Sequence, residues 1–321
     1  MKNVQKNRIA GALFGVAVGD ALGGPVEFMS AAQIARTHGR VSSMIGGGWL
    51  GLIPGEVTDD TQMTLCVAEG IVEAPFSPIE AVGRRFISWA NSRPKDIGSA
   101  CAASIRNAQR IGRNVLHDNP TAEDWEQASA ETQRSFGHPV EGNGALMRTV
   151  YPGLYYKDSS VAEYWAMKIG QMTHAGPRST GACVLYAHMI HLLTASEISI
   201  PLEHDAQRPV QAFLLDQCEG EAEYQRAVRA ETVEEHDGGY VVDSMKIALG
   251  SLATSSTFAE AVETAVNLGG DADTNAAITG GLAGAWYGYD AIPAEWIAYL
   301  SDDVKAQLLR LADAAFEARE G

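Results

Sequence analysis

The spacing of hydrophobic residues is helical along almost the whole chain. Apolar positions recur every three or four residues, whereas alternating apolar and polar runs are scarce, and the one at 41–45 is too short to build a sheet. No tandem repeat and no low-complexity linker interrupts the pattern. We therefore expect one all-α domain over residues 1–321, with helices at 7–22, 62–72, 78–90, 99–111, 161–172, 179–195, 209–217, 241–253, 258–266, 275–287 and 303–318.

The first of these helices carries glycines at intervals of four: Gly11, Gly15 and Gly19. They share one helix face and allow another helix to approach closely. The basic start from Lys2 and the apolar run at 9–18 superficially resemble a signal peptide. Because the run contains glycines and ends at Asp20, we expect a core helix instead. We also expect no membrane span, since no apolar stretch approaches the required length of roughly 20 residues.

The charge composition limits the classes of partner that this protein can bind. The 321 residues hold 40 acids against 24 Lys plus Arg, a net charge of −16. Such a surface repels nucleic acid and anionic membranes, so we expect neither as a partner. Part of the acidity lies at 219–237, which we expect to be the surface of a charged helical segment. The absence of a long apolar heptad repeat favours a monomer.

The four cysteines, Cys66, Cys101, Cys183 and Cys218, are scattered and form no CxxC motif. We expect reduced thiols and a cytoplasmic protein.

Two short acidic clusters mirror each other more than two hundred residues apart. They are Thr58-Asp59-Asp60-Thr61 and Asp271-Ala272-Asp273-Thr274. Each follows a glycine-rich loop and precedes an apolar helix. Helix capping would explain either cluster alone, because acids in a first turn stabilise a helix by about 0.3–1 kcal/mol each. Two similar clusters favour a metal site, and ligands that are all oxygen suit Mg²⁺ or Mn²⁺ rather than zinc.

Four motifs in the chain resemble those of the ADP-ribosylglycohydrolase family, in the family's order and over nearly the whole length. They are Gly19-Asp20-Ala21-Leu22-Gly23 with Pro25 and Glu27, Gly55-Glu56-Val57-Thr58-Asp59-Asp60-Thr61-Gln62-Met63, Gly142-Asn143-Gly144-Ala145-Leu146-Met147-Arg148 and Gly269-Gly270-Asp271-Ala272-Asp273-Thr274-Asn275. The segment Pro94-Lys95-Asp96-Ile97-Gly98 resembles an active-site loop of one subgroup, the dinitrogenase-reductase-activating glycohydrolase and the ADP-ribosylarginine hydrolases.

The resemblance implies an orthogonal multi-helix bundle with two divalent cations, Mg²⁺ or Mn²⁺. Such a centre would clamp the ribose hydroxyls of an ADP-ribosyl group and polarise a water molecule. Carried onto this chain, the implied metal ligands are Thr58, Asp59, Asp60, Asp271, Asp273 and Thr274.

The resemblance also implies catalytic roles for three acids. Asp96 would act as a base on the ribose, Glu27 would gate substrate or position water over the metals, and Asp60 would be required for turnover. The plainer alternative makes Glu27 and Asp96 ordinary turn residues.

Four further residues are expected to bind substrate. Asn143 and Gly144 would present backbone N–H groups to the diphosphate, although Ala145 stands where many relatives have a serine. His174 lies in a Thr-His motif of the family, and Tyr240 matches an aromatic residue near the adenine. The alternatives are a plain turn, a structural histidine and a core tyrosine.

We therefore expect a metal-dependent hydrolase that removes ADP-ribose from arginine side chains of a modified protein. Two alternatives stay open: a hydrolase of serine-linked or other ADP-ribose conjugates, and a non-catalytic protein that binds ADP-ribose or a partner, for instance to neutralise a toxin. Prenyl-diphosphate chemistry uses a DDxxD motif, and it is excluded because Asp59-Asp60 is followed by Thr61, Gln62 and Met63.

Overall fold

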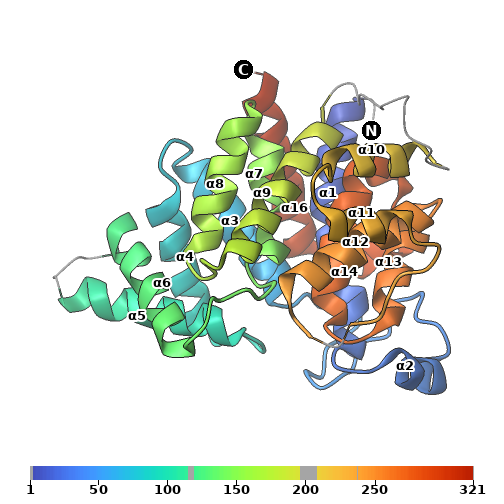
Figure 1. The fold of residues 1–321 in the computed structure, drawn as a ribbon, viewed down its shortest axis with the longest axis horizontal. Coiled ribbons are helices and arrows are strands. Elements are labelled where there is room, and N and C mark those ends of the chain that lie inside the picture. The colour runs from blue at the N-terminus through green and yellow to red at the C-terminus, as the bar shows by residue number, and fades with distance from the viewer. Residues whose placement is uncertain (1–2, 115–118, 196–207, 237, 321) are drawn as a thin grey trace.

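A computed structural model describes residues 3–114, 119–195, 208–236 and 238–320. Over these residues the chain is all-α, as expected, and contains no strand (Figure 1). The α-helices are α1 Val4–Gly23, α2 Ala31–His38, α3 Asp59–Glu73, α4 Ile79–Asn91, α5 Ser99–Asn114, α6 Ala122–Phe136, α7 Val150–Tyr155, α8 Ser159–Gln171, α9 Pro177–Leu193, α10 Pro209–Gln217, α11 Ala222–Arg229, α12 Val241–Thr254, α13 Phe258–Leu268, α14 Ala272–Tyr287, α15 Ala294–Tyr299 and α16 Asp302–Glu320. Three short 3-10 helices are η1 Gly24–Val26, η2 Leu146–Arg148 and η3 Tyr289–Ala291.

The centre of the fold is an antiparallel pair, α1 and α14. Small residues every four positions on α1 meet small residues on α14, in the pairs Gly11–Gly284, Gly15–Gly280, Gly19–Ala276 and Gly23–Ala272. A Cβ atom placed on Gly15 would lie only 2.0 Å from the Gly280 carbonyl oxygen, so the two backbones touch directly. The expected glycine face is confirmed. Because the pair is antiparallel, the end of α1 lies against the start of α14.

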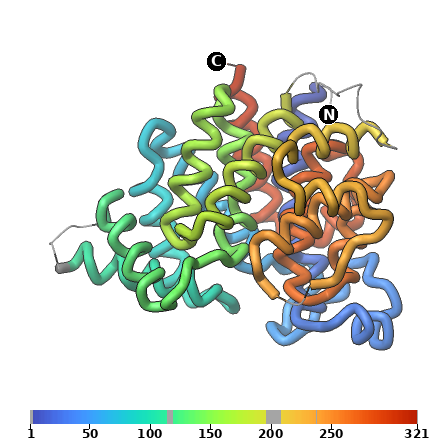
Figure 2. The backbone as a smooth tube through the Cα atoms, viewed as in Figure 1, coloured from blue at the N-terminus to red at the C-terminus, as the bar shows by residue number. Residues whose placement is uncertain are grey.

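Other helices surround this pair. Helix α16 packs beside α1, and both reach the same end of the molecule (Figure 2). Helices α12 and α13 pack on α14, while α3 pairs with α4 and α5 pairs with α6. The α5–α6 pair projects at one edge of the molecule, and α2 lies at the opposite lower corner (Figure 1).

The periodicity located the long helices but missed four shorter or more polar ones: α2, α6, α7 and α15. Capping boxes at Ser30–Gln33 and Thr121–Asp124 begin two of them and were a readable signal. The charged segment at 219–237 is helical only at Ala222–Arg229, and the remainder to residue 236 is irregular, so that expectation was too broad. Lys2 and Asp237 lie outside the described residues.

One expectation about membranes was wrong as stated. The stretch Val4–Val26 is long and apolar enough to cross a bilayer. Its most apolar 18-residue window is entirely buried within the protein, against α14 and α16. Burial on all sides is what a core helix of this composition shows.

The cysteines are all free, as expected. Cys101, Cys183 and Cys218 are buried and Cys66 is partly buried.

Candidate active site

The two acidic clusters meet at the end of the α1–α14 pair. Asp20, in the last turn of α1, is fully buried and accepts hydrogen bonds from the start of α3. Its carboxylate receives the Thr58 N–H at 3.0 Å and the Thr58 hydroxyl at 2.8 Å. It also receives the Thr61 N–H at 3.1 Å and the Thr61 hydroxyl at 2.5 Å. Asp20 therefore fastens the first cluster to α1, whose end already lies against the second cluster.

The carboxylates form two overlapping groups. Asp20, Asp60 and Asp273 offer oxygens that all lie within 4.8 Å of one another, and Glu27, Asp271 and Asp273 do the same. Asp273 belongs to both groups. Two neighbouring three-carboxylate groups that share one member are an arrangement suited to a pair of hard divalent cations.

The hydrogen bonding does not support capping as the purpose of these acids. Thr58 and Asp271 stand at the N-cap positions of α3 and α14, yet neither side chain makes a capping hydrogen bond. The Thr58 hydroxyl contacts Asp20 and, at 3.2 Å, Asp60. One oxygen of Asp60, Oδ1, is fully buried and has no hydrogen-bond partner. A buried carboxylate oxygen without a donor is costly unless a cation is its partner, so the residues fit a metal centre.

Electrostatics lead to the same conclusion. Burial, reinforced by the neighbouring acids, raises the pKa of Asp59 to about 7 and the pKa values of Asp60 and Asp273 well above their usual range. Burial also raises the pKa of Glu27 to about 8. It raises the pKa of Asp20 to about 6, and the four hydrogen bonds that Asp20 accepts from Thr58 and Thr61 oppose this rise. Acids this crowded resist losing their protons together. A divalent cation would replace those protons.

The acids open onto a cavity of about 440 Å³. Glu27, Asp59, Asp271 and Asp273 lie in its wall together with Asp96. The Asp96 side chain is half-buried and accepts the Ile97 N–H at 2.8 Å. Burial raises the pKa of Asp96, while the Ile97 N–H opposes the rise. The structure thus brings every predicted acid of the site to one place.

Thr274 lies in the same wall. Its hydroxyl is 3.4 Å from Oδ2 of Asp60, the oxygen that Thr58 also contacts. The predicted threonines therefore flank one carboxylate, at the junction of α3 and α14.

The predicted diphosphate donors need one correction. Asn143 lies in the cavity wall, but its backbone N–H donates to the Gly239 carbonyl at 2.9 Å and is not free for a phosphate. Its side-chain amide instead donates to Asp271 at 2.8 Å and to Ser244 at 2.9 Å. Asn143 therefore orients a carboxylate of the acidic groups. Gly144 also lines the cavity, and its role with the diphosphate stays a prediction.

His174 lies in the cavity wall beside the glycines of the 142–144 turn. Burial, helped by the nearby Arg148 guanidinium, lowers the pKa of His174 to about 3, so the ring is neutral. Arg148 donates to the Thr173 hydroxyl at 2.7 Å, and that hydroxyl lies 2.8 Å from Nδ1 of His174. The neutral ring has one N–H donor and one acceptor nitrogen, and Nδ1 uses one of these with the Thr173 hydroxyl. Nε2 makes no hydrogen bond to the described residues, so it can meet a ligand.

Tyr240 stands at the edge of the site. It pairs with Gly142 through an isolated β-bridge, and its side chain is 41% exposed. Gly239 lines the cavity, whereas Tyr240 is not among the described lining residues. Stacking of Tyr240 on adenine stays a prediction.

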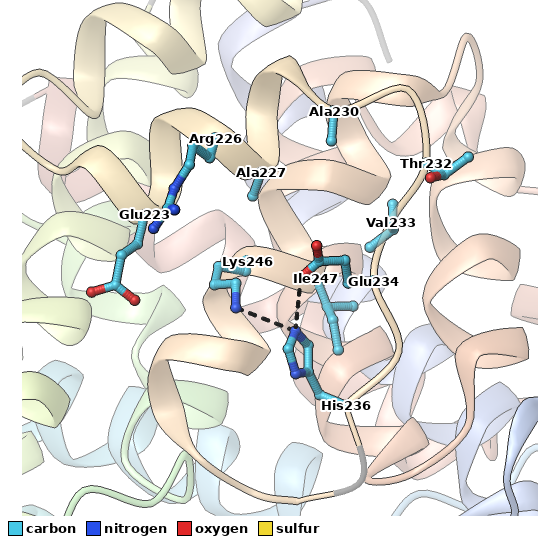
Figure 3. A pocket seen from close by; sticks show the side chains of 10 residues that line it. All are labelled: Glu223, Arg226, Ala227, Ala230, Thr232, Val233, Glu234, His236, Lys246 and Ile247. Carbon is cyan, nitrogen blue, oxygen red and sulfur yellow. Dashed lines mark hydrogen bonds and ion pairs between the residues drawn. The ribbon is translucent and has the colours of Figure 1, made fainter.

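A second hollow, of about 190 Å³, lies between α11, α12 and the irregular segment that ends at His236 (Figure 3). Lys246 in its wall pairs with Asp243 at 2.9 Å, and His236 lies 3.5 Å from the same acid. Charges of both signs are paired there, in contrast to the acidic cavity. The acidic cavity is therefore the candidate active site.

Sequence reasoning had placed Asp20 only in a family motif and at the end of an apolar run. The structure makes it a member of the first acidic group and the acceptor that holds α3 in place. An aspartate that follows a helix face of glycines was the available signal, because such a face has to be buried.

Comparison with known proteins shows the family of the chain. The chain matches the ADP-ribosylglycohydrolase family over residues 1–321. It is 33% identical over 309 residues to the ADP-ribosyl-[dinitrogen reductase] glycohydrolase of Rhodospirillum rubrum, covering 96% of this chain and 95% of that protein. It is 30% identical over 295 residues to the ADP-ribosylarginine hydrolase Tri1 of Pseudomonas putida, and the match covers 91% of this chain and 73% of that protein.

A solved structure of an ADP-ribosylglycohydrolase-related protein complex has the same fold. It superposes with a TM-score of 0.74 at 28% identity, over 97% of this chain and 99% of that one. The expected bundle type is confirmed. The chain belongs to the ADP-ribosylglycohydrolase family and is a hydrolase of ADP-ribose conjugates.

Proposed function

We propose that this protein removes ADP-ribose from modified arginine side chains of other proteins. The observation that carries the proposal is the charge of the cavity. Six carboxylates lie in its wall, and no lysine or arginine is among the described lining residues; the acids are Glu27, Asp59, Asp96, Glu141, Asp271 and Asp273. Asp20 and Asp60 lie behind them. Two divalent cations that held all eight acids ionised would neutralise four of their eight negative charges.

The remaining negative charge favours a cationic leaving group. Arginine carries a guanidinium, whose charge and fixed N–H donors suit carboxylates. A serine hydroxyl is neutral and gains nothing from this field. The Asp96 loop and the likeness to an ADP-ribosylarginine hydrolase also support arginine as the modified residue.

The cations would be held by the two acidic groups, together with Thr58, Asp59 and Thr274. Two such ions would orient the ribose hydroxyls and lower the pKa of a water molecule. We propose that both cations are Mg²⁺ or both are Mn²⁺, because all the proposed ligand atoms are oxygens.

Within this site Asp96 takes a proton from a ribose hydroxyl, since the Ile97 N–H holds one of its oxygens in the cavity wall. The bond between the anomeric carbon and the guanidine nitrogen breaks, the electron pair stays on the nitrogen, and this nitrogen takes the proton from Asp96. Water then supplies a hydroxyl to the anomeric carbon and returns a proton to the ribose oxygen. Free ADP-ribose and unmodified arginine are the products.

The test is a substrate panel. Protein ADP-ribosylated on arginine and protein ADP-ribosylated on serine are each incubated with Mg²⁺, Mn²⁺ or EDTA. We expect release of ADP-ribose from the arginine conjugate with either metal and no release with EDTA. Release from the serine conjugate alone would contradict the choice of arginine, and equal release with EDTA would contradict the metal centre.

A further inference from the structure

Two exposed aromatic rings stand beside the acidic cavity. Phe28 lines the cavity and is 65% exposed, and Trp49 is 56% exposed. Their ring centroids lie 5.6 Å apart with the planes tilted by 38°. Large aromatic side chains normally bury most of their surface, so an open pair at a cavity mouth marks a binding surface.

The backbone of Phe28 is held in an unfavourable conformation. Its φ angle is +63°, which a bulky residue rarely adopts. Its N–H donates to the Gly270 carbonyl at 2.7 Å, and Ser30, two residues further on, pairs with Gly269 through a β-bridge. The strain is thus imposed by the loop that leads to Asp271. Strain of this kind persists where the geometry serves a function.

The turn that carries Trp49 is held in place by hydrogen bonds and by contact with neighbouring backbone. It lies in a short turn, residues 47–52, that is closed by two hydrogen bonds between Gly47 and Leu52, of 2.6 and 2.8 Å. A Cβ atom on Gly48 would lie 2.8 Å from the Pro25 carbonyl, so this turn rests directly on the backbone before Glu27. Lys95 donates to the Gly51 carbonyl at 3.4 Å and thereby joins the turn to the Asp96 loop.

The side chain of Trp49 is also hydrogen-bonded to Glu27, an acid of the candidate site. Trp49 Nε1 donates to Oε2 of Glu27 at 2.7 Å. The two rings and this carboxyl group therefore form one connected group at the cavity mouth.

We propose that the Phe28–Trp49 pair is the subsite for the leaving group, and that it stacks the planar guanidinium of the modified arginine. The inference rests on the proposed function and adds a specificity determinant to it. Guanidinium groups stack on aromatic faces and are more weakly hydrated than ammonium groups. A neutral hydroxyl leaving group lacks this attraction. Trp49 is in addition a positioning residue, because its N–H orients Glu27.

The experiment separates stacking from positioning with two variants and one matched control. Phe28→Leu keeps an apolar side chain but removes the aromatic face. Trp49→Phe keeps a ring but removes the N–H donor to Glu27. Phe76→Leu alters a ring that is 94% exposed and lies outside the cavity wall. For each variant, kcat and KM are measured with the arginine conjugate, and the Kd of ADP-ribose, which lacks the leaving group, is measured by calorimetry.

We expect Phe28→Leu to raise KM for the arginine conjugate by about 5- to 30-fold, in line with the strength of cation–π contacts, with the Kd of ADP-ribose unchanged. Trp49→Phe should lower kcat by about tenfold with KM and the Kd of ADP-ribose unchanged. Phe76→Leu should change none of these.

Three results would overturn the inference: wild-type kinetics in Phe28→Leu, an equal loss of ADP-ribose affinity in that variant, or wild-type kcat in Trp49→Phe. Failure of the wild-type protein to cleave the arginine conjugate would instead overturn the proposed function.

Discussion

Replacing Gly19 by alanine tests how the site is assembled. Gly19 precedes Asp20 on α1 and faces Ala276 on α14. The added Cβ atom would lie 2.1 Å from the Ala276 carbonyl oxygen, whereas ordinary contact begins at 3.4 Å. The helix axes must therefore separate by about 1 Å, because both atoms belong to rigid backbone or sit next to it.

The magnitude follows from two opposing effects. Overpacking of this kind costs about 1–3 kcal/mol, and here the separation also loosens neighbouring contacts along the pair. Alanine offsets part of the cost, because it favours the helix by up to about 1 kcal/mol over glycine. We expect a net destabilisation of about 2 kcal/mol and a Tm about 3 °C lower. Since Asp20 and Asp273 would move apart, binding of Mn²⁺ should weaken as well.

Gly181 provides the control. It lies inside α9, and a Cβ atom there would meet nothing within 4 Å. Gly181→Ala should raise stability by up to about 1 kcal/mol and leave Mn²⁺ binding unchanged. Thermal melts in EDTA and Mn²⁺ calorimetry measure both quantities. If Gly19→Ala had the stability and the Mn²⁺ affinity of the wild type, the account of the α1–α14 pair would be refuted.

Three further predictions concern the acids. Asp60→Asn should abolish turnover and Mn²⁺ binding, yet raise the Tm in EDTA, because asparagine is neutral in both states, whereas burial and the neighbouring acids force Asp60 to take up a proton on folding; a lower Tm would contradict this. In EDTA, stability should fall as the pH rises from about 5 to 8, because folded Asp59 and Glu27, with pKa values near 7 and 8, keep protons that the unfolded chain has released by about pH 5. Denaturant titrations in EDTA and in Mg²⁺ should show that the metal stabilises most at pH 8, and a slope of opposite sign would refute the linkage. Asp96→Asn should lower kcat about 100-fold or more with Mn²⁺ affinity retained, as measured by steady-state kinetics and calorimetry.

Part of the candidate site was predictable because its residues are local in sequence. Two carboxylates at a helix start after a glycine-rich loop are a recognisable local pattern, and it occurs at Asp59-Asp60 and at Asp271-Ala272-Asp273. The glycine face of α1 also predicted a close helix contact. What the pattern did not name was the partner helix, since small residues on α14 could have met any other small face.

The roles of single polar groups were less predictable. The backbone N–H of Asn143 was expected to meet a phosphate, but the chain from Gly239 returns beside it and accepts that hydrogen. Trp49 gave no signal in the sequence, because its bond to Glu27 depends on a turn that folds back over η1. Such pairings join distant segments and leave no local pattern.

The sequence alone determined that this chain is helical, that one helix packs through glycines and that two sets of carboxylates were available for hard cations. Helical periodicity and helix starts are set within a few residues, so they can be read directly. The tertiary structure decided that α1 and α14 run antiparallel, which places Asp20 beside Asp273 and creates two groups of acids that share one member. Direction and register between helices depend on packing of the whole core, and no short stretch of sequence contains that information.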